Sequence, residues 1–175
     1  MKYIFETARL RVRQFETDDG QRLYEIHGEE EFRKWIPNEC YADLAEAAGA
    51  VRFYKDRADR GQLPYVLAVE SKETGELIGD TGINAVEGKP EEVEIGYGIC
   101  GKYRGKGYAT ELVEAMTGYA VAAFGIRVLY GRVMRGNVAS ARVLEKNGYV
   151  FQGEEYGAED DPYNRGMLIY RKSLL

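Results

Sequence analysis

The 175-residue chain carries its clearest chemical signal at residues 104–109, which read Arg-Gly-Lys-Gly-Tyr-Ala and stand directly before an apolar-periodic segment. Gly105 and Gly107 have no Cβ, so backbone N–H groups around them can approach a ligand closely. The first N–H groups of a helix lack internal acceptors, and the positive end of the helix dipole favours an anion. This pattern predicts a phosphate-binding turn. Its alternative is a turn in which the glycines serve backbone geometry alone.

Two other phosphate-binding motifs fit the sequence poorly. Residues 96–101 read Gly-Tyr-Gly-Ile-Cys-Gly and match the dinucleotide pattern G-x-G-x-x-G, but they lie inside an alternating strand instead of a turn that opens a helix. Lys106 is followed by Gly107, where a Walker A loop needs Ser or Thr to reach magnesium. Dinucleotide binding and phosphoryl transfer therefore lose their main support.

The elements that position this turn follow from hydrophobic periodicity, capping residues and turn residues. Predicted strands cover residues 10–15, 65–70, 77–85, 93–100, 128–133, 149–152 and 167–170; predicted helices begin near residue 18 and cover 43–60, 109–124 and 138–147. The helix at 109–124 forms a crossover long enough to make the strands at 93–100 and 128–133 parallel, whereas the earlier hairpins are antiparallel. The expected fold is α/β (α+β), with a mixed, mostly antiparallel sheet flanked by helices in a single domain over 1–175.

Composition narrows the class of protein. The length suits one domain, and no uncharged apolar run approaches the ~20 residues of a membrane span. The charged amino terminus lacks the apolar stretch of a secretory signal, so we expect a cytoplasmic protein without a membrane partner. Cys40 and Cys100 lack CxxC spacing, and with His27 as the single histidine we expect neither a disulfide framework nor a metal site.

The net charge of -5 argues against a nucleic-acid partner, because binding to phosphate backbones normally needs a basic face. Only strong binding to nucleic acid that weakens steeply with salt would support a nucleic-acid-binding function. The oligomeric state, monomer or homodimer, stays open.

Two sequence blocks resemble the GNAT N-acetyltransferases. Residues 104–109, with Arg104, Gly107 and Ala109 as anchors, resemble the family's Q/R-x-x-G-x-G/A motif between a strand and a long helix. Residues 137–149 resemble the N-x-x-S…E-K-x-G-F/Y block of the branch that acetylates the amino termini of ribosomal proteins. With the strand at 93–100 and the opening residues, the resemblance spans nearly the whole chain.

The resemblance implies the GNAT fold, in which the parallel central strands splay apart, and acetyl-coenzyme A as co-substrate without a metal. The pyrophosphate would lie on backbone N–H groups of the glycine turn, and the pantetheine arm along the end of the strand at 93–100. The implied cofactor-binding residues are Ile99, Cys100, Arg104, Gly105, Lys106, Gly107, Tyr108, Ala109, Thr110 and Asn137. Asn137 has an alternative role as a helix cap, since Asn favours that position.

Acetyl transfer to an amine requires the neutral amine. An α-amine with a pKa of about 8 is partly neutral at pH 7, whereas a lysine or polyamine near ~10.4 needs more help. A carboxylate acting through water could accept the proton. The resemblance offers Glu94, near the catalytic glutamate of histone-acetylating relatives, and Glu159, which matches a glutamate of the ribosomal-protein branch. Their alternatives are an arginine partner for Glu94 and a solvated loop acid for Glu159.

The departing thiolate needs a hydrogen-bond donor. Many GNAT relatives use a tyrosine four residues after the Ser140 position, but this chain has Leu144 there. The ribosomal-protein branch points to Ser140 as the replacement, stabilising the thiolate without acting as an independent acid. Helix capping is its alternative role.

We expect the substrate pocket between the two early helices, including residues 35–41, and the acidic loop at 154–165. The predicted function is acetyl-coenzyme A-dependent acetylation of a primary amine, such as a protein amino terminus, a polyamine or a small amine, by direct transfer in a ternary complex. The alternative is a non-catalytic acyl-coenzyme A-binding sensor or scaffold.

Overall fold

A computed structural model describes residues 1–161 and 165–174. These residues form one eight-stranded sheet in the order β1-β2-β3-β4-β5-β6-β8-β7. The strands are β1 (Tyr3–Glu6), β2 (Leu10–Arg13), β3 (Tyr65–Ser71), β4 (Leu77–Val86), β5 (Lys89–Ile99), β6 (Val128–Met134), β7 (Val150–Glu155) and β8 (Met167–Ser173). Neighbouring strands are antiparallel except for β5 and β6, so the predicted mixed sheet is confirmed.

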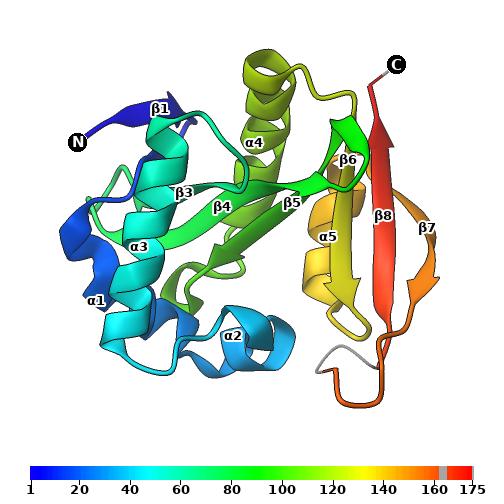
Figure 1. The fold of residues 1–175 in the computed structure, drawn as a ribbon, viewed down its shortest axis with the longest axis horizontal. Coiled ribbons are helices and arrows are strands. Elements are labelled where there is room, and N and C mark those ends of the chain that lie inside the picture. Colours follow the sequence, from blue (N-terminus) through cyan, green and yellow to red (C-terminus); the bar gives the residue numbers. More distant parts are fainter. Residues whose placement is uncertain (162–164, 175) are drawn as a thin grey trace.

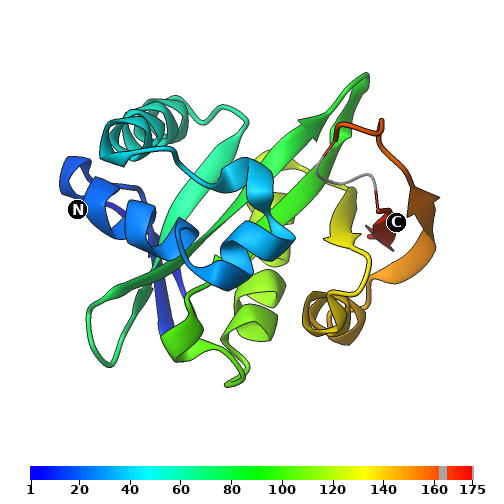
Figure 2. The same ribbon diagram turned by 90° about the horizontal axis from the view of Figure 1, so that it is seen from below.

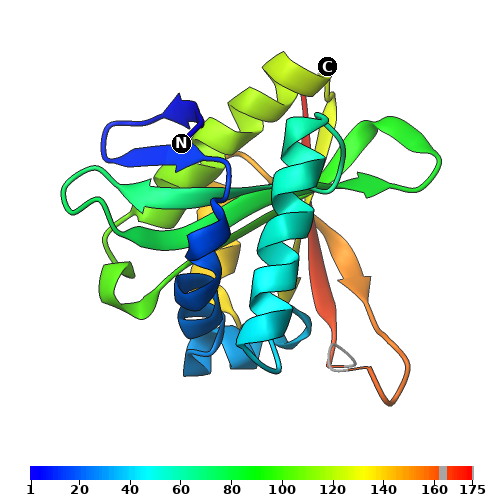
Figure 3. The same cartoon turned by 60° about the vertical axis from the view of Figure 1, so that its left-hand side comes forward.

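Helices cover both faces of the sheet. They are α1 (Gly20–His27), α2 (Glu30–Trp35), α3 (Leu44–Asp59), α4 (Tyr108–Phe124) and α5 (Val138–Lys146), with short 3-10 turns at Thr17–Asp19, Pro37–Glu39 and Gly101–Tyr103. Figures 1 and 3 show α1 and α3 on one face and α4 and α5 on the other, with α2 at one end of the molecule. No helix in the described part of the chain is long and apolar enough to cross a bilayer.

The central strands diverge at the middle of the sheet. β5 and β6 pair in parallel only from Glu92↔Val128 to Ile95↔Gly131. Beyond Ile95, β5 continues alongside β4, while β6 continues alongside β8. The two strands therefore separate as they approach the glycine turn, and Figure 1 shows this divergence.

Alternation along β5 decides what faces each helical layer. Val93, Ile95 and Ile99 are buried in the core against the α4 layer, which includes Leu112 and Met116. The alternate residues point to the opposite face, because successive side chains of a strand do so. That face carries Glu94 and the glycines at 96 and 98, beneath α1 to α3.

Most predicted elements are present, with shifted ends. β5 begins at Lys89 instead of 93, because its first residues complete the hairpin with β4, and β7 begins at Val150 instead of 149. Neither β1 nor α2 was predicted as an element. β1 pairs only with β2 at the sheet edge, and the six residues of α2 are too few to establish a helical period.

Candidate active site

A cavity of about 880 Å³ occupies the region where β5 and β6 diverge. Seen from below in Figure 2, α2, α4 and α5 stand around this region. The Trp35 ring at the end of α2 reaches across to Gly136, where an added Cβ would lie 3.6 Å from it. The cavity thus runs from the glycine turn, beneath α2, to the turn that precedes α5.

The glycine turn forms the donor wall, our name for residues 104–110. Gly105 and Gly107 have φ values of 72° and 82°, in the left-handed region that favours glycine. Gly107 is also the N-cap of α4 and supplies no side-chain cap, which leaves the first helical N–H groups available to a ligand. The turn has the features that an anion cradle needs.

Arg9, which was not predicted as a site residue, lies directly before β2 and holds the donor wall in place. Its Nε donates to Glu111 Oε2 at 2.7 Å, and its NH1 group donates to the Lys106 carbonyl at 2.8 Å. The guanidinium also lies 4.1 Å from the centroid of the Tyr108 ring. These partners are about 100 residues away in sequence, so no local pattern signals the role.

Arg104 holds the other end of the turn. Its Nε donates to the Ile99 carbonyl at 2.9 Å, and its guanidinium carbon lies 5.3 Å from the centroid of the Phe32 ring. Glu29 accepts a hydrogen bond from the Gly101 N–H at 2.8 Å. Arg104 therefore links the end of β5 and α2 to the start of the donor wall.

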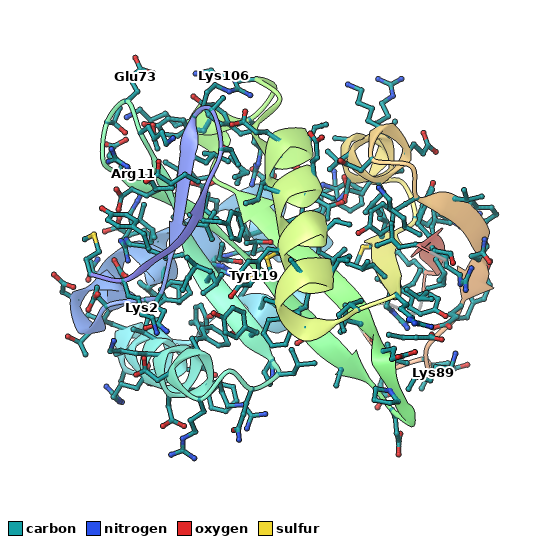
Figure 4. The ribbon with its side chains drawn as sticks, turned by 90° about the horizontal axis from the view of Figure 1, so that it is seen from above. Lys2, Arg11, Glu73, Lys89, Lys106 and Tyr119 are labelled. Atoms are coloured by element: carbon teal, nitrogen blue, oxygen red, sulfur yellow. The ribbon has the colours of Figure 1, made fainter. Side chains whose placement is uncertain are left out.

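Most of the predicted cofactor residues line the cavity, namely Ile99, Arg104, Gly105, Gly107, Tyr108, Ala109, Thr110 and Asn137. Two do not. Cys100 is buried, with its Sγ 3.8 Å from Arg22. The Lys106 ammonium donates to the Lys102 carbonyl at 3.3 Å, and Figure 4 places Lys106 on the loop before α4.

The start of α5 brings Asn137 and Ser140 to the cavity. Asn137 caps the helix, its Oδ1 accepting from the Ser140 N–H at 3.3 Å, and it also lines the cavity. The Ser140 hydroxyl lies 2.8 Å from the Tyr97 hydroxyl, which also donates to the Ser140 carbonyl at 3.1 Å. Sequence reasoning missed Tyr97, because 43 residues separate it from its partner.

Leu144 occupies the position where many relatives have tyrosine. Its side chain is fully buried, and an added Cβ on Gly131 would lie only 2.5 Å from it. Leu144 therefore packs closely on β6. The pair of hydroxyl groups near the N-terminus of α5 comes instead from Ser140 and from Tyr97 on β5.

Glu94 lies in the wall opposite the donor wall. It is half-buried, lines the cavity and pairs across the sheet with Asn84 and Tyr130. Burial raises the pKa of Glu94; the charge of Arg132 opposes the rise and that of Glu155 adds to it. A raised pKa suits a carboxylate that accepts a proton near neutral pH.

Glu159 lies farther along the acidic loop. It is exposed and is not among the residues that line the cavity, whereas Tyr156, Gly157 and Asp161 are. Residues 162–164 of the predicted substrate loop lie outside the described residues. Of the two base candidates, the structure brings Glu94 to the cavity wall.

A third carboxyl group, Glu39, was not predicted. It lines the cavity from the Pro37–Glu39 turn, and its carbonyl lies 2.7 Å from Nδ1 of His27. The other ring nitrogen of His27 lies 2.5 Å from Asp80. Although the residue as a whole is exposed, desolvation of its carboxyl group and then the charge of Asp80 raise the pKa of Glu39 to about 7; the charge of His27 opposes the rise, and that of Glu94 adds to it.

His27 is buried and interacts with both Asp80 and Glu39. Burial by itself lowers its pKa, but the charges and hydrogen bonds of Asp80 and Glu39 outweigh that effect and hold the pKa above its ordinary value. The resulting His27–Asp80 pair anchors α1 to β4 and supports the turn that carries Glu39.

Comparison with known proteins identifies the class. Residues 9–150 match the model of the acetyltransferase (GNAT) domain, which covers most of the chain. The chain therefore belongs to the GNAT acetyltransferase family, and the prediction of an acyltransferase enzyme is confirmed.

Individual proteins are similar to this chain in sequence or in fold. The chain is 29% identical over 171 residues to an uncharacterized N-acetyltransferase, p20, of Bacillus licheniformis, covering 97% of this chain and 94% of that one. Its fold is similar to that of the ribosomal-protein-S5-alanine acetyltransferase of Vibrio fischeri, with a TM-score of 0.83, 18% identity and coverage of 97% and 95%. It is also similar to RimL, a ribosomal L7/L12 α-N-protein acetyltransferase solved with coenzyme A, with a TM-score of 0.81, 20% identity and coverage of 99% and 98%.

Proposed function

We propose that this protein transfers an acetyl group from acetyl-coenzyme A to a primary amine, directly, in a ternary complex. The observation that carries the proposal is one continuous cavity lined by the glycine turn, by Glu94 and by the Ser140–Tyr97 hydroxyl pair. These groups match the three needs of the reaction: a cradle for the donor, a proton acceptor for the amine and a hydrogen-bond donor for the departing sulfur.

The donor wall suits the anionic part of acetyl-coenzyme A. Left-handed Gly105 and Gly107, together with the side-chain-free N-terminus of α4, offer backbone N–H groups to a pyrophosphate. Beyond Ile95, the edge of β5 that faces β6 is not paired with that strand, so it can pair with the amides of the pantetheine arm. Coenzyme A in the RimL structure is consistent with this role.

Glu94 is the proposed base. Its carboxylate takes a proton from the amine, directly or through water, and the amine lone pair then attacks the thioester carbonyl. As the C–S bond breaks, the electron pair passes to sulfur and the N–C bond remains. The raised pKa of Glu94 brings its proton affinity closer to that of the amine and limits the energetic cost of the transfer.

Ser140 and Tyr97 act on the sulfur. When the Tyr97 hydroxyl donates to Ser140 Oγ across the 2.8 Å contact, in place of the Ser140 carbonyl, the serine proton is left to donate a hydrogen bond to the thiolate. Burial raises the pKa of Tyr97 above its ordinary value, which is already higher than that of a thiol at ~8.5. Tyr97 therefore positions Ser140 and does not itself give up its proton to sulfur.

The test is release of free thiol when the protein is incubated with acetyl-coenzyme A and a panel of amines. The panel includes peptides with free amino termini, because RimL and the Vibrio fischeri neighbour are ribosomal-protein acetyltransferases. We expect turnover with at least one class of amine. Calorimetry that detects coenzyme A binding, without turnover of any amine or peptide, would instead indicate a sensor or scaffold.

A further inference from the structure

A second cavity, of about 230 Å³, lies beside the main one on the face covered by α1 and α3. We call it the side chamber; both cavities are lined by Glu39, Asn84, Gly96 and Tyr97. In the β4–β5 register, Asn84 faces Glu94 and Gly82 faces Gly96. The chamber is therefore lined by Asn84, the direct neighbour of the proposed base across the sheet, and by Gly96, two residues along β5.

Gly96 lies at the boundary that the two cavities share. A Cβ added there meets no atom within 4 Å, which means that the space above this residue is open. Gly96 has no positive φ that would require glycine, unlike Gly105 and Gly107. Its lack of a side chain leaves open space at the boundary that the two cavities share.

The walls of the chamber combine aromatic rings with carboxylates. Tyr41, Phe53 and Tyr54 contribute rings, and Glu39 and Asp80 contribute carboxyl groups. Aromatic faces and carboxylates together are the surroundings that organic cations favour. An anion would be repelled here, and a purely apolar group would give the Glu39 carboxyl group no polar contact.

The charge balance also favours a cation. His27 lines the chamber, but its Nε2 is directed to Asp80 and its Nδ1 to the Glu39 carbonyl, so the His27 charge is matched by Asp80. The charge of His27 also acts on Glu39, so this one histidine offsets at most one of the two carboxylates, and Glu94 lies nearby on the main cavity. Above the pKa of Glu39, about 7, the single histidine charge therefore faces three carboxylates, those of Asp80, Glu39 and Glu94.

We propose that the side chamber binds a second positively charged group of the acceptor, while the reacting amine lies beside Glu94. The implied acceptor class is a small aliphatic diamine or polyamine. This inference rests on the proposed function for the reacting end, but the chamber itself is a cation site whose occupancy can be measured without turnover.

The experiment compares 1,5-diaminopentane with 5-amino-1-pentanol, and their three-, four- and six-carbon counterparts, in thiol-release assays and in calorimetry with coenzyme A present. Each pair has similar length and differs by one positive charge. We expect the best diamine to exceed its amino alcohol about tenfold in kcat/KM and in affinity, as cation–π and carboxylate contacts in a partly desolvated site would give.

Two variants locate the preference. Ala50→Phe fills the chamber from α3, and Glu39→Gln removes the carboxylate at its boundary with the main cavity. In each variant, the ratio of kcat/KM for the diamine to that for its amino alcohol should fall towards one, and so should the ratio of the affinities. Ala45→Phe is the matched control, because Ala45 is exposed on the same helix and lines neither cavity. It should keep the preference, and circular dichroism would show that all three variants fold.

The outcomes separate the two proposals. Turnover of amines with no diamine preference in rate or affinity would overturn the chamber assignment and leave the proposed function intact. Diamine binding that Ala50→Phe abolishes, without turnover of any amine, would support the chamber and count against the proposed function. A preference that persists in both Ala50→Phe and Glu39→Gln would also overturn the chamber assignment.

Discussion

The donor wall and the opposite wall of the cavity are built in different ways. The donor wall is one short segment, residues 104–110, whose backbone supplies the chemistry and which Arg9 holds from outside. The opposite wall, which we call the acceptor wall, carries Glu39 after α2 and Glu94 on β5, and it is supported from the side chamber by His27 on α1 and Asp80 on β4. Because backbone N–H groups supply the chemistry of the donor wall, many side chains are compatible with it. The chemistry of the acceptor wall instead requires each carboxylate side chain.

This difference predicts separate kinetic effects. Changes in the donor wall should weaken binding of acetyl-coenzyme A, because the N–H groups act on the bound donor in its ground state. Changes in the acceptor wall should alter kcat and the pH profile, because its groups move or hold protons.

The largest expected effect follows Glu94→Gln. Loss of a general base lowers kcat by about 100-fold, while calorimetry should show unchanged affinity for acetyl-coenzyme A. In the wild type, kcat/KM should fall as pH drops through the raised pKa of Glu94, since the base is active only when ionised. This acid limb should vanish in the variant. Glu159→Gln is the comparison, and a greater loss there than in Glu94→Gln would move the base to the acidic loop.

The hydroxyl pair should give the next largest effect. Tyr97→Phe and Ser140→Ala should each lower kcat by about tenfold, the scale of one hydrogen bond to a charged group. The double variant should be no slower than Ser140→Ala alone, because Tyr97 acts through the serine. Independent losses that multiply in the double variant would contradict this positioning role. Melting temperatures of the three proteins control for folding.

Gly107→Ala tests the donor wall. A left-handed conformation costs a non-glycine residue about 1–2 kcal/mol, and the added Cβ would lie 3.4 Å from the Arg9 guanidinium. We expect affinity for acetyl-coenzyme A to fall by about tenfold with a smaller change in kcat. Gly118→Ala, at an exposed and open position in α4, is the matched control and should bind normally. Normal binding by Gly107→Ala would remove the turn from the donor site.

The smallest expected effects concern the pH dependence of stability, and the residues that support the two walls, Glu111 and His27, should respond with opposite signs. The raised pKa of His27 means that its stabilisation is fully present below the unfolded value of about 6.5 and is lost as pH rises through the folded value. For Glu111, burial raises the pKa, but hydrogen bonds from Thr7 and Arg9 outweigh it and lower the pKa overall. Its stabilisation is present above the unfolded pKa and is lost as pH falls through the folded value.

Urea unfolding between pH 4 and 9 measures both responses. His27→Gln should flatten the loss of unfolding free energy at neutral to alkaline pH, and Glu111→Gln should flatten the loss in acid. A His27→Gln profile that still declines with rising pH as steeply as the wild type would show that the His27–Asp80 pair does not carry this dependence.

Elements with a clear period or a motif could be predicted, and the others could not. The helix at 109–124 and the strand at 93–100 follow from apolar spacing. The helical crossover from that strand to the strand at 128–133 predicts the parallel β5–β6 pair that the structure contains. β1 and α2 were missed, because an edge strand of four residues and a helix of six give too little pattern. α2 nevertheless supplies Trp35 and Phe32 to the cavity.

By itself, the sequence determined the family, the mixed sheet and the donor turn, because glycine spacing, helix start and strand alternation are local properties of contiguous residues. Only the tertiary structure decided which side chains meet across the cavity. Arg9 with Glu111, Tyr97 with Ser140, and His27 with Asp80 are pairs separated by 102, 43 and 53 residues. Their distances depend on how the sheet is ordered and how its helices pack, and such long-range placement leaves no short-range pattern in a single sequence.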